Sequence, residues 1–265
     1  EIYADKETLK VKINEVISEF VNSASAPIID DFTTTVRPQN GFVNSGGSSF
    51  IPILNTTAGT LQLTDETIGT GAGFVTYDAV GTLAKINQAS KYYCKFKTYM
   101  VDTSGTIGQG VFFRASPTSP LTTDAIALNT YTIIWRTGVR DLNVFWGTVR
   151  IGQFNNVLPV FQTGVDYVCE VVFDHLTTPG STIISMYLDG VLIRAYTDVK
   201  RAITFSYVSV GAYQTSVGNN ASSYFLRDLE IDTVPSMGVG TAGNYKIRLP
   251  NSLTNNYLSL GYNTN

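Results

Sequence analysis

The sequence has little charge, little histidine and no long hydrophobic run, and each shortage excludes a class of function. Only 15% of the 265 residues are charged and the net charge is −3, so the basic excess of a nucleic-acid-binding protein is missing. The single histidine, His175, has no partners for a catalytic triad or a zinc site. No apolar run is long enough to span a membrane, and no signal peptide is visible. We therefore expect no nucleic-acid partner, no membrane insertion, no cofactor and no metal.

Cysteine is also scarce, and both cysteines fall within segments that read as strands. Cys94 and Cys169 each alternate with apolar or aromatic residues, which places their side chains in the core. Two buried free thiols are favoured over a disulfide, although a bridge stays open if the two strands are neighbours. Two cysteines do not decide the cellular compartment.

The N-terminal segment is the one stretch with helical periodicity. Residues 1–22 carry an apolar seam with heptad spacing, followed by a short small-residue linker at residues 23–27. The helix either packs on its own domain or is the end of a coiled coil that joins subunits. We favour the coiled coil because no second helix is available as a partner. The seam, and hence the predicted oligomerisation contact, consists of Ile2, Leu9, Ile13, Val16 and Phe20.

Residues 28–234 read as one β domain. Short apolar runs recur about every ten residues and are separated by Gly, Pro, Asn, Asp, Ser and Thr, which predicts an antiparallel sandwich or barrel. Residues 235–265 begin with a glycine-rich connector. This C-terminal extension is compatible with an extra hairpin, a wrap onto a neighbouring subunit or the start of a further domain.

The clearest local signal is Asp189-Gly190, which predicts a two-residue hairpin turn of type I′. In that register Leu188 pairs with Val191, and the pairing continues so that one face of the ribbon is wholly apolar. On that expectation the core-facing residues are Ile184, Met186, Leu188, Val191, Ile193 and Ala195.

The order of the β segments resembles a known family. YVCEVVFD, ISMYLDGVLIRAY, FSYVSVGAY and YFLRDLEI, in that order, resemble the C-terminal half of concanavalin A-like lectin/glucanase jelly rolls, including laminin-G-like modules. IIDDFTTT, and KYYCKFKTYM followed by GVFFRAS, resemble the opening strands. The resemblance implies two curved antiparallel sheets packed face to face, with a concave outer face that often holds ligand.

A heptad segment before such a module is similar in architecture to tailed-bacteriophage tail fibres and receptor-binding proteins. That similarity implies a homotrimer located on the virion, extracellular when it acts, with other virion proteins and a host-surface glycan as partners. Host attachment through carbohydrate binding is the function we expect, strengthened by three copies of a weak site. Two alternatives stay open: a glycan-cleaving enzyme of the same fold, and a purely structural fibre or capsid-decoration protein.

The enzyme alternative depends on one acidic strand. Glucanases of this fold carry alternating acids on one strand, and Asp228, Glu230 and Asp232 come closest to that pattern. The final Glu is missing, so a solvent-facing strand is favoured, and we expect no enzyme. Glu170 and Asp174 are a weaker pair.

Calcium is common in modules of this fold but is not supported by a dense run of ligands here. The aspartates at loops or strand ends, for which a turn-forming role is favoured, are Asp30, Asp31, Asp102, Asp124 and Asp198.

Sugar binding has the best case among the candidate functions. It requires an aromatic ring that stacks on the apolar face of a pyranose, with donors for the hydroxyl groups nearby. Alternation places Trp146 with Arg150 on the polar side of its strand, although a subunit interface or the lip of the core explains Trp146 equally well. If the strands concerned share the concave sheet, the carbohydrate-binding candidates are Trp146, Arg150, Arg114, Tyr99 and Lys97.

Overall fold

The computed structural model describes ten stretches of the chain, and every regular element in them is a strand. The described residues are 28–38, 41–44, 51–64, 71–78, 91–101, 110–116, 130–174, 181–199, 207–214 and 223–233. No helix among them is long and apolar enough to cross a membrane. The predicted helix at residues 1–22 with its five seam residues, the linker at 23–27 and the extension at 235–265 lie outside these stretches, so they stay predictions.

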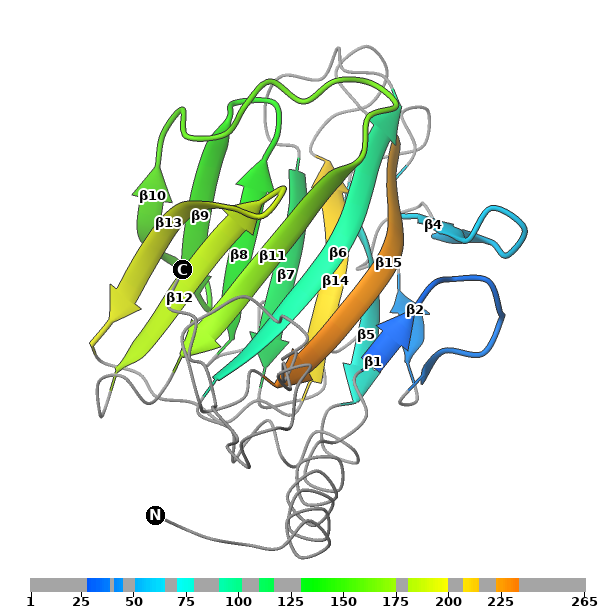
Figure 1. The fold of residues 1–265 in the computed structure, drawn as a ribbon, viewed down its shortest axis with the longest axis horizontal. Helices are drawn as coiled ribbons and strands as arrows, with labels where there is room; N and C mark the ends of the chain where they lie inside the picture. The colour runs from blue at the N-terminus through cyan, green and yellow to red at the C-terminus, as the bar shows by residue number, and fades with distance from the viewer. Residues whose placement is uncertain are drawn as a thin grey trace, which may run out of the picture.

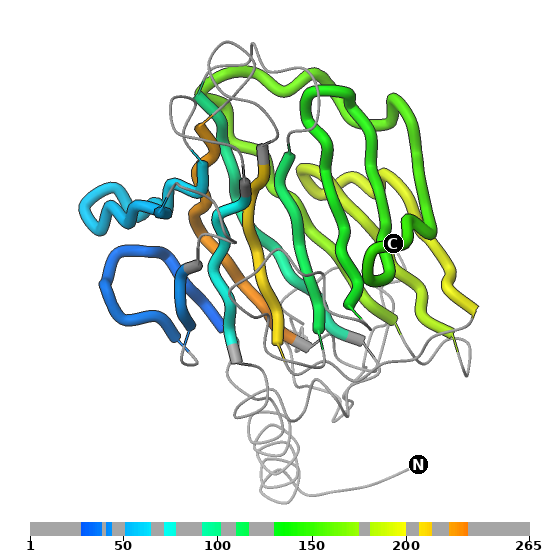
Figure 2. The backbone as a smooth tube through the Cα atoms, turned by 180° about the vertical axis from the view of Figure 1, so that it is seen from behind, coloured from blue at the N-terminus to red at the C-terminus, as the bar shows by residue number. Residues whose placement is uncertain are grey.

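Fifteen strands form two antiparallel sheets packed face to face, as the sequence predicts. Sheet A faces the viewer in Figure 1 and sheet B faces the viewer in Figure 2. Sheet A has the order β13-β12-β11-β6-β15-β4-β3, with β1 also paired to β15, and sheet B has the order β10-β9-β8-β7-β14-β5-β2. The strands of sheet A are β1 (Ile28–Asp30), β3 (Ile53–Asn55), β4 (Thr60–Gln62), β6 (Lys91–Val101), β11 (Tyr167–Asp174), β12 (Thr182–Leu188), β13 (Val191–Asp198) and β15 (Ser223–Thr233). Those of sheet B are β2 (Phe42–Asn44), β5 (Gly71–Asp78), β7 (Gly110–Ser116), β8 (Tyr131–Arg136), β9 (Asp141–Trp146), β10 (Val149–Phe154) and β14 (Tyr207–Gln214).

Aromatic side chains fill the space between the sheets. Phe173 of sheet A lies with its ring centroid 5.6 Å from that of Phe113 and 5.8 Å from that of Tyr131, both in sheet B. Phe96 of sheet A meets Trp135 of sheet B edge to face at 5.8 Å. Large rings bury much apolar area at a small cost in rotamer entropy, so this core holds the sandwich together.

Two buried tyrosines tie the sheets together through hydrogen bonds. The Tyr77 hydroxyl on β5 donates to Asp30 Oδ2 on β1 at 2.9 Å. The Tyr131 hydroxyl on β8 donates to Asp198 Oδ2 on β13 at 2.9 Å. Each bond crosses from sheet B to sheet A, and both aspartates are buried.

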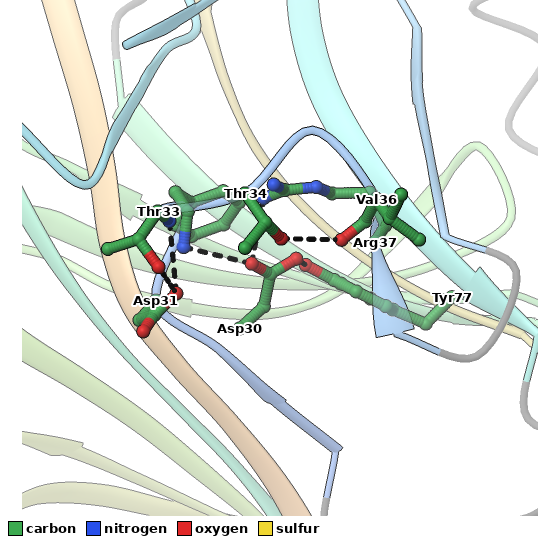
Figure 3. A network of polar contacts seen from close by, with 8 residues as sticks. Asp30, Asp31, Thr33, Thr34, Val36, Arg37 and Tyr77 are labelled. Atoms are coloured by element: carbon green, nitrogen blue, oxygen red, sulfur yellow. Dashed lines mark hydrogen bonds and ion pairs between the residues drawn. The ribbon is translucent and has the colours of Figure 1, made fainter. Parts of the chain in front are cut away.

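Asp30 is the centre of a buried polar network that Figure 3 shows. Its Oδ1 accepts hydrogen bonds from the Phe32 amide at 2.9 Å and from Arg37 Nη1 at 2.7 Å. The side chains of Asp30 and Arg37 are each 4% exposed. The Arg37 guanidinium also lies over the Phe32 ring, 5.0 Å from its centroid. A buried ion pair of this kind is tolerated because hydrogen bonds and ring contacts replace the lost water.

The hairpin turn is confirmed, but the predicted register beyond it is wrong. Asp189 and Gly190 both have positive φ, 51° and 77°, as a type I′ turn requires, and Leu188 pairs with Val191. Ile193 then forms a β-bulge, which moves the following pairs by one residue, so that Ser185 pairs with Ala195. Val191, at the edge of the sheet, is 62% exposed rather than buried.

The cysteines are free and buried, as favoured from the sequence. Cys94 pairs with Val171, and Cys169 pairs with Phe96, on the adjacent strands β6 and β11. Burial raises the pKa of both thiols well above the ordinary value, because a thiolate would lose its hydration there.

Because both thiols are buried, we expect them not to react with thiol reagents in the native protein. A thiol-specific reagent such as dithionitrobenzoate should modify no cysteine in the native protein and two in denaturant. A stoichiometric fast reaction in the native state would show that β6 or β11 opens readily.

The Asp30 network predicts an asymmetry between two conservative variants. Asp30→Asn leaves the Arg37 charge buried without its counter-ion and should lower the free energy of unfolding by about 3–5 kcal/mol. Tyr77→Phe removes one hydrogen bond and should cost about 1–2 kcal/mol. Urea unfolding of both variants measures the difference; equal losses would mean that the ion pair is not what the network depends on.

Candidate functional site

The five sugar-binding candidates from the sequence do not lie on one surface. Lys97 and Tyr99 are on β6 in sheet A, while Arg114, Trp146 and Arg150 are on β7, β9 and β10 in sheet B. The outer faces of the two sheets point to opposite sides of the sandwich. A single binding site can therefore contain the candidates of sheet A or those of sheet B, but not both.

The candidates on sheet A are engaged by their neighbours. The Tyr99 ring stacks on Phe225 with centroids 4.7 Å apart and an interplanar angle of 3°, and the Arg227 guanidinium lies over it at 5.3 Å. Burial raises the pKa of Tyr99. Lys97 Nζ pairs with Asp228 Oδ2 at 2.6 Å, with both side chains about half exposed. The Tyr99 ring is thus in contact with two side chains of β15, so it is already engaged within sheet A.

Trp146 lies on the core side of sheet B rather than on the polar side that alternation indicates. It packs against the main core cluster and meets Tyr131 edge to face at 4.7 Å. The reason is the two-residue turn at Gly147 and Thr148: Trp146 pairs with Val149 and ends β9, so residues beyond the turn belong to another strand. The sequence left a subunit interface and the lip of the core open as explanations of Trp146, and a position at the lip of the core fits this placement.

The other two candidates, Arg114 and Arg150, share a row that crosses the outer face of sheet B (Figure 2 shows the strands). Neighbouring strands contribute one residue each, and successive residues are Cα partners in the sheet. We call this set the Arg114 row; from β10 to β2 it contains Arg150, Phe145, Thr132, Arg114, Ser209, Thr76 and Phe42. Its middle is polar and its flanks are aromatic.

Arg114 is fixed by aromatic rings from the next row. Its guanidinium lies 4.2 Å from the Phe112 centroid and 5.9 Å from the Phe74 centroid. Gly211 on β14 lies between Phe112 on β7 and Phe74 on β5. A Cβ atom at this glycine would lie only 2.6 Å from Phe112 Cζ. Glycine at 211 therefore leaves room for the Phe112 ring beneath Arg114. A guanidinium held in this way presents its N–H donors in a fixed plane.

Three buried polar atoms on this face lack a hydrogen-bond partner within the described structure, and two of them are oxygens. The oxygens are Thr132 Oγ1, in the Arg114 row, and Asn143 Oδ1, on the adjacent strand β9, and the third atom is Arg114 Nε. Thr132 and Asn143 are each 1% exposed. A buried oxygen without a partner costs free energy, which a hydrogen bond from an ordered water or from another group would recover.

A second polar group borders the row. Asp141 Oδ2 lies 3.9 Å from Arg136 Nη1, and Asp141 Oδ1 accepts a hydrogen bond from the Asn156 amide at 3.0 Å. Burial raises the pKa of Tyr213, while the charge and hydrogen bond of Arg136 counteract the rise. These groups satisfy one another, and the described face holds no nucleophile paired with a base.

The acids of the glucanase-like segment lie on the opposite sheet and do not form a regular alternating series. Asp228 has a φ of 49° and belongs to a bulge in β15, between Arg227 and Glu230 in the pairing with β6. Glu230 Oε1 accepts a hydrogen bond from the Tyr93 hydroxyl at 2.7 Å. Glu170, across Lys95 from Glu230, has its pKa raised by burial, while the Lys95 charge opposes the rise.

The three aspartates considered for calcium that the structure describes do not form a ligand cluster. In the described stretches, no three Asp, Glu, His or Cys side chains are grouped as metal ligands. Asp30 and Asp198 accept hydrogen bonds from tyrosines, and Asp31 accepts one from Thr33 at 2.7 Å. Asp102 and Asp124 lie outside the described residues.

The sequence contained a signal for part of the row that we did not use. In YVSVGAY, alternation places Val208, Val210 and Ala212 in the core and Ser209 on the other face. Thr132 has the same kind of position between Tyr131 and Ile133. The pairing register brings Ser209, Arg114 and Thr132 side by side. A single sequence does not reveal this register.

Comparison with known proteins relates the fold to carbohydrate recognition domains. The Emp47p carbohydrate recognition domain has a TM-score of 0.53 and 14% identity, with 79% of this chain and 96% of that chain covered. The VIP36 exoplasmic/lumenal domain bound to Ca²⁺ and mannose has a TM-score of 0.56 and 10% identity, covering 82% and 92%. Metal-free Emp46p gives 0.54 and 11%, covering 78% and 95%. No protein-family model and no curated protein sequence matches the chain.

These likenesses confirm the concanavalin A-like jelly-roll sandwich and correct the predicted location. The neighbours are L-type lectin domains, and VIP36 is represented by its exoplasmic/lumenal domain. Neither VIP36 nor Emp46p and Emp47p is a virion component, so the assignment of this chain to a virion is wrong. The bacteriophage tail-fibre origin and the trimer with virion partners have no support among them.

The partnerless hydroxyl of Thr132 predicts an unusual effect on stability. Thr132→Val keeps the shape and removes a buried polar group, so the free energy of unfolding should rise by about 1–2 kcal/mol. Urea denaturation without ligand tests this, with Thr98→Val as a matched control because Thr98 Oγ1 is likewise buried without a partner, in sheet A. A loss of stability in Thr132→Val alone would mean that this hydroxyl is bonded in solution.

Proposed function

We propose that the chain is a carbohydrate-binding module whose glycan lies on the outer face of sheet B, along the Arg114 row. The observation that carries the proposal is the Arg114 guanidinium resting on Phe112, with Thr132 and Ser209 as its Cα partners on either side. A donor group fixed before binding loses little entropy when it takes up a ligand, which favours recognition of a flexible sugar.

The polar centre of the row matches the needs of sugar hydroxyl groups. Arg114 is partly exposed and carries N–H donors, and beneath it lie the Thr132 hydroxyl, which can both donate and accept, and the Asn143 acceptor, each on a side chain that is 1% exposed. The Thr76 and Ser209 hydroxyls share a hydrogen bond of 2.9 Å, which aligns this pair with the row. A sugar ring carries donors and acceptors at adjacent positions, which suits a row with polar groups at its centre.

The flanks of the row supply apolar contacts. Phe42 is 39% exposed, and Phe145 on β9 is half-buried, so ring surface remains available at both ends. Pyranoses present a patch of C–H groups that packs on aromatic rings. Polar groups between aromatic flanks are the usual composition of a small-molecule site.

The fold neighbours support the ligand class. VIP36 has been solved with mannose, with Man2 and with Man3GlcNAc, and Emp46p and Emp47p are represented by carbohydrate recognition domains. Their low identity to this chain shows the fold alone, so the argument for the present site comes from its own side chains.

A matched pair of aromatic variants tests the proposal. A glycan array with the full chain should identify a ligand, and titration calorimetry should then measure its affinity. Phe145→Ala should weaken binding about 5- to 10-fold through loss of a ring contact. Tyr99→Ala, on the opposite sheet, should leave the affinity unchanged. The proposal fails if the array identifies no glycan, or if Tyr99→Ala is the variant that loses binding.

A further inference from the structure

The strand β10, at one edge of sheet B (Figure 1), directs two polar side chains toward the same face. Arg150 and Gln153 stand three residues apart, and in a regular strand two such residues point to opposite faces. The register of β10 against β9 shifts between Arg150 and Gly152, which marks a β-bulge. The bulge adds one residue to the count, so both side chains lie on one side of the sheet.

The partners on β9 show that this side is the outer face of sheet B. Arg150 is the Cα partner of Phe145, and Gln153 is the Cα partner of Asn143. Phe145 and Asn143 lie on either side of Val144, which belongs to the main core cluster. Alternation along β9 therefore points both partners away from the core, and Arg150 and Gln153 stand beside them.

The bulge is packed against the end of the sandwich. A Cβ atom at Gly152 would lie 3.2 Å from the Tyr196 ring of β13 and 3.4 Å from Val144 Cβ, so a side chain at this position would have to displace a neighbour. Beyond the bulge, Gln153 Nε2 donates a hydrogen bond to Asn155 Oδ1 at 2.6 Å. A polar group that is oriented before binding loses little entropy when it takes up a ligand.

Exposure along the Arg114 row decreases from this edge inward. Arg150 is exposed and Phe145 is half-buried. Thr132 is 1% exposed, and past the partly exposed Arg114 the next residue, Ser209, is again 1% exposed. A ligand that lies on the row therefore reaches side chains between β10 and Arg114 on β7.

The far end of the row has a ring but no exposed polar group of the row beside it. Phe42 is 39% exposed, and its Cα partner Thr76 is fully buried. The Thr76 hydroxyl shares a hydrogen bond of 2.9 Å with that of Ser209. A sugar site needs an aromatic ring together with polar groups, and in this row only the β10 end combines the two in exposed positions.

We propose that the site binds glycans by the chain end and takes two or three sugar units, which enter over β10. This inference rests on the proposed function and defines which part of a glycan is the ligand. One unit packs on Phe145 and exchanges hydrogen bonds with Arg150 and Gln153. The terminal unit reaches Arg114, three strand steps or about 14 Å from the edge strand. The rest of the glycan leaves past β10 into solvent.

Titration calorimetry with oligosaccharide ladders tests the inference. The probes contain one, two, three or five units of mannose, glucose or N-acetylglucosamine, and a sugar that only the glycan array identifies is used in the same way. Affinity should rise by about 10-fold or more from one unit to three and by less than about 2-fold from three to five. A polymer of about 50 units should bind at its ends alone, hence no more than two copies of the protein.

Surface variants locate the ligand at the edge. Arg150→Gln and Gln153→Ala should each weaken binding of the trisaccharide about 3- to 10-fold, because each removes a hydrogen bond to a sugar. Arg194→Gln is the matched control, since Arg194 is also exposed and also lies beside a bulge, on β13 of sheet A. Phe42→Ala, at the far end of the row, should likewise leave the affinity unchanged. Urea unfolding of the variants establishes that all of them fold.

The two proposals fail in different ways. Affinity that keeps rising to five units, or a polymer that binds many copies, would overturn chain-end binding but leave carbohydrate binding intact. Unchanged affinity in Arg150→Gln and Gln153→Ala would overturn it too, as would a loss in Phe42→Ala equal to that in Phe145→Ala, because the ligand would then cross the whole row. If no ladder binds and the array gives no glycan, both proposals fall.

Discussion

Two buried aspartates fix the position of one sheet over the other. Asp30 and Asp198 each accept a hydrogen bond from a tyrosine that belongs to the opposite sheet. A tyrosine that spans a dry core must find a partner for its hydroxyl, and the partner in turn loses water. Sliding one sheet past the other would break both bonds at once. The aromatic core supplies the attraction between the sheets, and these directional bonds supply the alignment.

That alignment makes the two outer faces chemically independent. The side chains of each strand alternate between the shared core and an outer face, so a single strand contributes to only one of the two surfaces. Sheet A uses its outer charges and rings against one another, as the stack of Tyr99 on Phe225 shows. Sheet B instead combines a supported guanidinium with unsatisfied oxygens at Thr132 and Asn143.

The fold was predictable from local signals, whereas the site was not. Asp189-Gly190 specified a turn by its backbone requirements, and the alternation in YVCEVVFD specified a core face. Alternation fails where a strand bulges or ends. Ile193 and Asp228 each shift the parity of the residues that follow, and the turn at Gly147 separates Trp146 from Arg150. The Arg114 row draws on seven strands that are distant in sequence, so it exists only once their pairing is known.

The bulges have a further consequence for the two strands that end the sheets. β13 and β10 lie at the same end of the sandwich (Figure 1), where the Tyr196 ring would lie 3.2 Å from a Cβ atom at Gly152. Each of these strands contains a bulge beside an exposed arginine, Ile193 with Arg194 and Ile151 with Arg150. A bent, charged edge is a poor template for the strand of another molecule. The irregularities that mislead alternation therefore protect this domain against edge-to-edge aggregation.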